Sequence, residues 1–127
     1  MNNYFNQFEQ MDLEEALKFT YNVSATFPKR KIVFLLSNFT QAKSAKLEFS
    51  ELINTIPEWT RHKITRNSNA QLRTEFENGL AVYFMHDPDN LRGFTVDGLF
   101  VSSGYGEDAL ANIIPCFARC SFIKIIK

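Results

Sequence analysis

Apolar side chains recur three or four residues apart in two stretches of the chain, the spacing that places them on one face of a helix. The first stretch begins at Asp12, and the second follows Thr40, a residue type that often caps a helix. The pattern predicts helices over about residues 12–26 and 40–56, and Pro57 ends the second because proline cannot continue a helix.

Continuous apolar runs predict strands between and after these helices. Ile32 to Leu36 is apolar at every position, which is typical of a strand buried on both faces of a parallel sheet. Asn78-Gly79 separates the strand-like runs 72–77 and 80–84 and predicts an antiparallel hairpin. The remaining predicted elements are a strand over 99–101, a helix over 107–117 and a strand over 122–126.

Helices alternating with strands indicate an α/β fold with a mainly parallel sheet. The 127 residues are enough for one domain, so we expect a single domain over residues 1–127. Fourteen basic and fourteen acidic side chains cancel, which argues against whole-molecule attraction to nucleic acid or anionic membrane. The longest apolar runs fall far short of the roughly 20 residues that span a bilayer. We therefore expect a cytoplasmic protein without membrane contact.

The residues able to bind metal are few. Cys116 and Cys120 lie four apart in a predicted helical stretch, and we interpret them as buried thiols. Together with His62 and His86 they make a nominal zinc set, but the spacings match no short zinc motif. The acidic turn 87–90, directly after His86, either binds a hard cation or is a solvated turn. We expect no metal.

The densest basic cluster is Arg61, His62, Lys63 and Arg66, with Trp59 beside it and Arg92 further along the chain. Basic side chains next to an aromatic ring can contact phosphates and stack on a base, so these residues are candidate contacts for nucleic acid or a protein partner. In the alternative interpretation, the tryptophan anchors a loop to the core and the charges are solvated.

Several short motifs occur in an order that resembles the ATPase domain of the large terminase subunit, the DNA-packaging motor of tailed bacteriophages. The resemblance covers roughly residues 9–125. The motifs are Phe27-Pro28-Lys29-Arg30-Lys31, Gln41-Ala42, Ile56-Pro57, Phe76-Glu77-Asn78-Gly79, Leu91-Arg92-Gly93 and Pro115. The resemblance implies a three-layer core like that of P-loop NTPases, with a mainly parallel sheet plus a β-hairpin, in truncated form.

The residues that carry nucleotide chemistry in that family are replaced here. Aligned from Lys31, the family's phosphate-binding positions fall on Gln10, Asp12, Leu13, Glu14 and Glu15. Glycine, lysine and hydroxyl side chains have thus become apolar or acidic, and carboxylates there would repel a triphosphate. Glu9 stands where the family has a catalytic arginine.

The metal and general-base positions of the family fall on Ser102 and Ser103, after the predicted strand 99–101. Neutral hydroxyls are poor substitutes for the carboxylates that hold Mg²⁺ and orient water. The family's coupling motif would fall near Ile126 and Lys127, and its nuclease domain has no counterpart in this sequence. We therefore expect no cofactor, no small-molecule substrate and no ATPase activity.

Asp12 suggests how such a site could be closed. We hypothesise that its side chain accepts hydrogen bonds from the backbone amides near Glu14 and Glu15 and so caps the first helix internally.

The resemblance, together with the replaced residues, implies a catalytically inactive, terminase-like phage protein that acts by protein interaction in the bacterial host cytoplasm. Its partner would be a phage packaging component or a host protein, and it would modulate DNA packaging or another nucleic-acid-processing complex. A small DNA-binding accessory factor and a nucleotide-binding switch are the alternatives.

Overall fold

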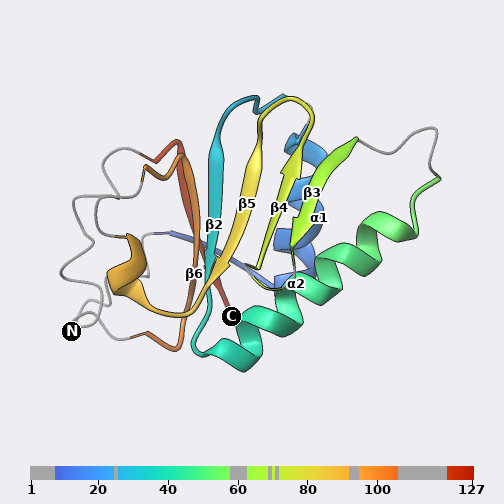
Figure 1. The fold of residues 1–127 in the computed structure, drawn as a ribbon. Helices are drawn as coiled ribbons and strands as arrows, with labels where there is room; N and C mark the ends of the chain where they lie inside the picture. The colour runs from blue at the N-terminus through green and yellow to red at the C-terminus, as the bar shows by residue number, and fades with distance from the viewer. Residues whose placement is uncertain are drawn as a thin grey trace.

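Strands and helices alternate along the residues described by the computed structural model, which are 8–24, 26–57, 63–68, 70, 72–91, 95–105 and 120–127. In chain order the elements are β1 (Glu9–Met11), α1 (Leu13–Val23), β2 (Lys31–Leu35), α2 (Phe39–Asn54), β3 (Ile64–Ser68), β4 (Arg73–Phe76), β5 (Ala81–Met85), the 3₁₀ turn η2 (Pro88–Leu91), β6 (Gly98–Ser102) and β7 (Phe122–Ile126) (Figure 1).

The seven strands form one sheet in the order β1-β7-β6-β2-β5-β4-β3. The first five strands in this order run parallel to one another, whereas β4 is antiparallel to both β5 and β3. The prediction of an α/β fold with a mainly parallel sheet and a hairpin is confirmed. The hairpin turns at Asn78-Gly79, where Gly79 has φ +90°, a backbone conformation that glycine adopts without strain.

Strand β2 lies in the middle of the sheet between β5 and β6. Its apolar side chains from Ile32 to Leu35 are fully buried, so the predicted burial on both faces is confirmed. Phe34 stacks on Phe84 of β5 and on Phe100 of β6, with ring centroids 5.1 and 4.4 Å apart. These aromatic contacts join three strands at one level of the sheet.

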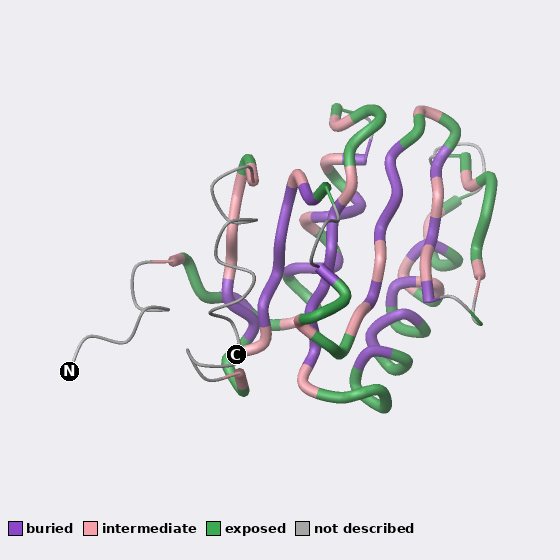
Figure 2. The backbone as a smooth tube through the Cα atoms, turned by 60° about the vertical axis from the view of Figure 1, so that its left-hand side comes forward, coloured by how far each residue is buried: buried purple, intermediate pink, exposed green. Residues whose placement is uncertain are grey.

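Alternating side chains of the sheet form two apolar clusters. On one face, Phe34 and its neighbours pack with the buried sides of α1 and α2, including Leu17 and Phe49. On the other, Val33 and Leu99 pack with side chains that include Leu91 of η2. Figure 2 shows the buried strands between more exposed loops and helix surfaces. The predicted helix 107–117 lies outside the described residues, and with it any third layer formed by that segment.

The helix predictions are confirmed in position, with shifts at their ends. The first helix ends at Val23 rather than near residue 26, because the turn at Ser24 closes with its amide and hydroxyl both donating to the Tyr21 carbonyl. The second begins at Phe39, because Asn38 rather than Thr40 is its N-cap residue. No helix in the described part of the chain is both long and apolar enough to cross a membrane.

Strands β1 and β3 were not predicted from the sequence. Strand β1 is three residues long, and β3 carries polar side chains from Thr65 to Ser68, so neither shows a clear apolar pattern. Strand β3 also contains an irregularity between Ile64 and Arg66, where its pairing with β4 shifts register.

A buried polar cluster joins α2 to the outer strands. The Lys46 side chain is fully buried, and its ammonium group donates to Ser50 Oγ at 3.0 Å and to Asn67 Oδ1 of β3. Thr74 Oγ1 of β4 donates to the same Asn67 oxygen at 3.2 Å. Burial lowers the pKa of Lys46, because the charged form loses solvation.

We predict that Gly98→Ala destabilises the fold by about 1–3 kcal/mol. A Cβ atom at this buried position of β6 would lie 2.3 Å from the Phe122 ring, which also packs edge-on against Phe19 and Phe100. Urea unfolding of the two proteins would measure the loss. The same substitution should lower the free energy of unfolding by less in a Phe122→Leu background, where the ring is absent. Equal stability of Gly98→Ala and the wild type would contradict the steric argument.

Candidate functional site

The ends of the parallel strands bring candidate residues to one edge of the sheet. Asp12 follows β1, Ser37 follows β2, and Ser102 and Ser103 close β6. The register aligns Ser102 with Ile126 of β7, and Ile126 in turn with Met11 of β1. In open α/β sheets, ligands bind outside the carboxyl ends of the strands. The positions that the resemblance assigns to nucleotide binding therefore lie at this carboxyl edge.

The connection from β1 to α1 consists of Asp12 alone. Gln10 pairs with Ile125 inside the sheet, while Leu13, Glu14 and Glu15 form the first turn of α1. A phosphate-binding loop needs several residues, with glycines, whose amides turn toward the phosphates. A one-residue connection provides no such loop.

The hypothesis that the Asp12 side chain caps α1 is wrong. Asp12 is the N-cap residue, and its carbonyl accepts from the Ala16 amide at 3.0 Å, but its side chain accepts no hydrogen bond from the helix amides. The carboxylate is exposed, so water can hydrogen-bond it in place of the amides. Glu14 and Glu15 in the first turn complement the helix dipole, and Glu14 forms an ion pair with Lys18 at 3.2 Å.

Ser102 and Ser37 hold the ends of β6 and β2 together. Their hydroxyl oxygens are hydrogen-bonded at 2.7 Å, and Ser102 Oγ also accepts from the Gly104 amide at 3.2 Å. A Cβ atom on Gly104 would lie 2.6 Å from Ser37 Oγ, so glycine allows this close approach. Ser103 is exposed, and its amide extends the contact to β7 by donating to the Ile126 carbonyl at 2.9 Å. Both predicted serines thus take part in bonds between strand ends.

The start of α2 is capped by its own side chains. Asn38 Oδ1 accepts from the Gln41 amide at 2.9 Å, and Gln41 Oε1 accepts from the Ser37 amide at 3.3 Å. This reciprocal arrangement resembles a capping box and satisfies amides that would otherwise be available to an anion.

Tyr105 is a residue of this edge that the sequence analysis missed. Its hydroxyl is within hydrogen-bonding reach of two carbonyl oxygens, Leu36 O after β2 and His86 O after β5, the latter at 2.6 Å. The phenol carries one proton, so the two carbonyls share it. Burial raises the pKa of Tyr105, and the nearby Asp87 carboxylate raises it further. A tyrosine three residues beyond a strand has no distinctive sequence signal.

The Asp87 carboxylate, in the turn after β5, accepts a hydrogen bond from within that turn. Asp87 Oδ1 accepts from the Asp89 amide at 3.0 Å, and the His86 ring packs edge-on against Phe39 at 5.5 Å. Within the described ranges, no group of three or more histidine, cysteine or acidic side chains could hold a metal ion. The geometry therefore favours the solvated turn over the cation site at residues 87–90.

Two residues of the basic cluster, Lys63 and Arg66, lie in the described part of the chain. Trp59, Arg61 and Arg92 lie outside the described residues. Lys63 precedes β3, which runs in the same direction as β2, so it lies at the opposite edge of the sheet from Ser102.

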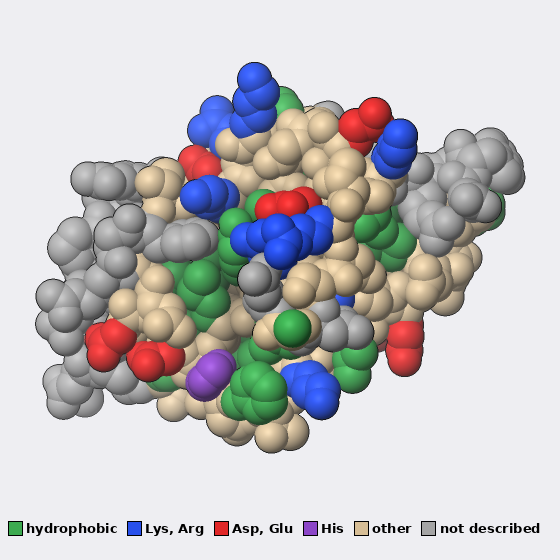
Figure 3. All heavy atoms as spheres, viewed as in Figure 1, with side chains coloured by type: hydrophobic (Ala, Val, Ile, Leu, Met, Phe, Trp, Pro, Cys, Tyr) green, Lys and Arg blue, Asp and Glu red, His purple; other side chains and the backbone are tan. Residues whose placement is uncertain are grey.

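Acidic residues accompany the two described members of this cluster. Lys63 pairs with Glu77 at 3.8 Å, and Arg66 lies opposite Glu75 in the register of β3 and β4. Acidic and basic side chains are interspersed on the described face shown in Figure 3. This mixture favours solvated surface charge over an extended phosphate-binding patch.

A scan against protein-family models finds no match for this chain, and a search of curated protein sequences finds none either. The site must therefore be judged from its own geometry. Its hydroxyl, amide and phenol groups bind one another and the ends of β2, β5, β6 and β7, which suits a closed structural edge better than a cradle for phosphate.

We predict that Tyr105→Phe lowers stability at neutral pH by about 0.5–1.5 kcal/mol, because one hydrogen bond to the carbonyls is lost. Above about pH 10 the folded wild type retains a phenolic proton that the unfolded chain releases. Wild-type stability should therefore fall with rising pH, and the variant should lack this part of the decline. Urea unfolding of both proteins at a series of alkaline pH values would measure the difference. A stability difference independent of pH would contradict the assignment.

Proposed function

We propose that this chain is a catalytically inactive, terminase-like phage protein that acts by binding another protein. The observation that carries the proposal is the one-residue connection between β1 and α1, at the positions where the resembled family binds phosphate. The acidic side chains of Asp12, Glu14 and Glu15 surround that connection and would repel a triphosphate. A chain with this arrangement keeps an ATPase-like fold but lacks the groups that bind and hydrolyse ATP.

The placement of the family-like motifs supports the resemblance. Residues 27–31 lead from the first helix into the second strand, Pro57 follows α2, and Asn78-Gly79 turns the hairpin. Each occupies the kind of junction at which the resemblance expects it. The three-layer, P-loop-like core remains part of this proposal.

The partner that fits this proposal is a phage packaging component, such as a terminase subunit or the portal, or a host protein. An inactive relative can occupy a surface that an active subunit uses, and so modulate DNA packaging or another nucleic-acid-processing complex. We place this activity in the cytoplasm of the bacterial host. The carboxylates of Glu77 and Glu75 beside Lys63 and Arg66 make the DNA-binding alternative less favourable.

We predict that calorimetric titration with Mg-ATP gives no saturable heat up to millimolar nucleotide, because the one-residue connection from β1 to α1 does not present a loop of amides to the phosphates and carboxylates surround the helix start. The double variant Asp12→Gly/Leu13→Lys should not hydrolyse ATP while Ser102 and Ser103 remain. A thermal stabilisation that grows with ATP concentration, as linkage requires of a ligand, would instead support the nucleotide-binding switch.

We predict that an affinity-tagged copy of this chain, expressed during phage infection, is recovered in a stoichiometric complex with a phage packaging protein or a host protein. Quantitative mass spectrometry against a tag-only control would measure the enrichment, and nuclease treatment of the lysate would separate protein contacts from DNA tethering. Recovery of the chain by itself, or a complex lost on nuclease treatment, would contradict the protein-binding function.

A further inference from the structure

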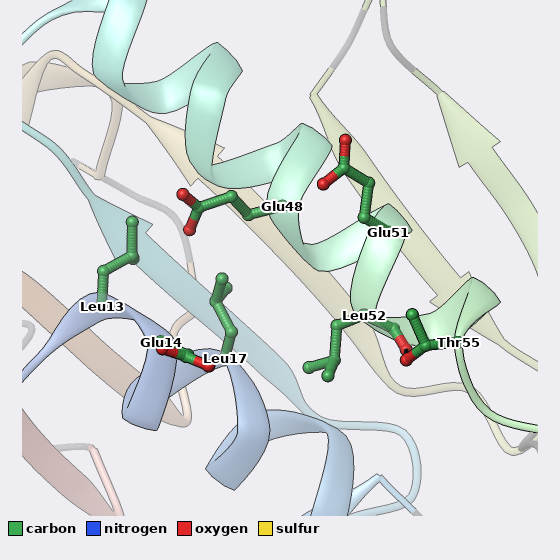
Figure 4. A pocket seen from close by; sticks show the side chains of 7 residues that line it. All are labelled: Leu13, Glu14, Leu17, Glu48, Glu51, Leu52 and Thr55. Carbon is green, nitrogen blue, oxygen red and sulfur yellow. Dashed lines mark hydrogen bonds between the residues drawn. The ribbon is translucent and has the colours of Figure 1, made fainter.

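A groove of about 590 Å³ lies between α1 and α2, where the two helices meet at the margin of the apolar core. Figure 4 shows its lining. The side chains of Leu13 and Leu17 rise from α1, and that of Leu52 points toward them from α2. The volume falls in the range of about 300–1,000 Å³ that is typical of ligand-binding clefts. Leu13 and Leu52 are half-buried and Leu17 is buried, so the floor of the groove is apolar.

Carboxylates border this apolar floor. Glu14 lines the groove from α1, and Glu48 and Glu51 line it from α2. Within the described part of the chain, the basic group that pairs with a lining carboxylate is Lys18, 3.2 Å from Glu14. Three carboxylates against one ammonium group leave an excess of two negative charges, on a chain whose net charge is zero. The negative charge is thus concentrated locally.

Helix α2 also exposes an apolar side chain outside the groove. Leu47 is 43% exposed and lies one helical turn before Glu51, so an exposed apolar side chain stands beside the acidic rim. An exposed leucine next to an apolar groove with charged borders is typical of a surface that receives an amphipathic helix.

We propose that this groove binds a basic amphipathic helix of a protein partner, with leucine-like side chains on the floor and lysine or arginine side chains against Glu48 and Glu51. This inference rests on the proposed protein-binding function and names the surface and the partner chemistry. The same carboxylates disfavour nucleic acid and anionic lipid, which are negatively charged. Among the described residues the carboxylates do not form a group able to hold a metal ion, so a cation is not the occupant that we propose.

The experiment uses two fluorescein-labelled peptides of about 18 residues, long enough for five helical turns. Both carry leucine at positions i, i+3, i+4 and i+7. One has lysine at the flanking positions and the other has glutamate. Fluorescence anisotropy against the full chain should show the basic peptide binding at least about tenfold more tightly, with an affinity that falls as salt is raised from about 0.05 to 0.3 M. Equal binding of the two peptides, or no binding of the basic one, would overturn the proposal.

Matched variants test the surface itself. Glu48→Gln/Glu51→Gln removes two exposed carboxylates from the rim and should weaken binding of the basic peptide about tenfold. Glu15→Gln/Asp89→Asn makes the same change in net charge at exposed positions outside the groove, and it should change binding less than about twofold. Equal weakening by the two double variants would show a general charge effect and overturn the assignment.

Recovery of complexes from infected cells separates this inference from the proposed function, and sedimentation tests self-association. If Glu48→Gln/Glu51→Gln recovers the same complex from infected cells as the wild type, the groove assignment fails and the protein-binding function stands. If the basic peptide binds the groove but infected cells yield no complex, the proposed function fails instead. Sedimentation showing self-association that depends on Glu48 and Glu51 would identify the occupant as a second copy of the chain and overturn the proposed partner.

Discussion

The stacking of Phe34 between Phe84 and Phe100 determines how three strands that are distant in sequence align. The rings lie at one level of β5, β2 and β6, at paired register positions. A shift of one residue in β2 would turn Phe34 away from both helices and exchange the two apolar faces of the sheet. Aromatic packing of this kind therefore sets the level at which the strands end.

The carboxyl edge follows from that alignment. Because β2 and β6 end at matching levels, the hydroxyls of Ser37 and Ser102 meet, and Tyr105 reaches the carbonyls of Leu36 and His86. Polar groups that would be costly to bury alone satisfy one another. The hydroxyl and phenol groups at the ends of β2 and β6 are therefore engaged in bonds within the protein.

The sequence predicts best those elements in which burial determines the spacing of apolar residues along the chain. The one-sided burial of α1 and α2 repeats every three to four residues, the two-sided burial of β2 is continuous, and Asn78-Gly79 supplies the positive φ of a tight turn. The polar strand β3 has no such period. It is held by its pairing with β4 and by the side chain of Lys46, which lies 21 residues before its partner Asn67.

The candidate site is less predictable for the same reason. The positions of Asp12 and Ser102 at strand ends follow from the order of the elements. Their partners do not, because Ser37 and Ser102 are 65 residues apart and Tyr105 reaches back 69 residues to Leu36. The side-chain direction of Asp12 depends on the competition between water and helix amides, which the residue type alone does not decide.

The irregular pairing of β3 has a consequence for self-association. As the last strand in the sheet order, β3 presents an edge on which another chain could add a strand. The register shift between Ile64 and Arg66 interrupts the straight ladder, and the exposed Thr65 and Arg66 side chains make the strand polar. The buried Lys46 side chain of α2 also donates a hydrogen bond to Asn67 of β3. These features protect the edge against the strand-to-strand pairing that leads to aggregation.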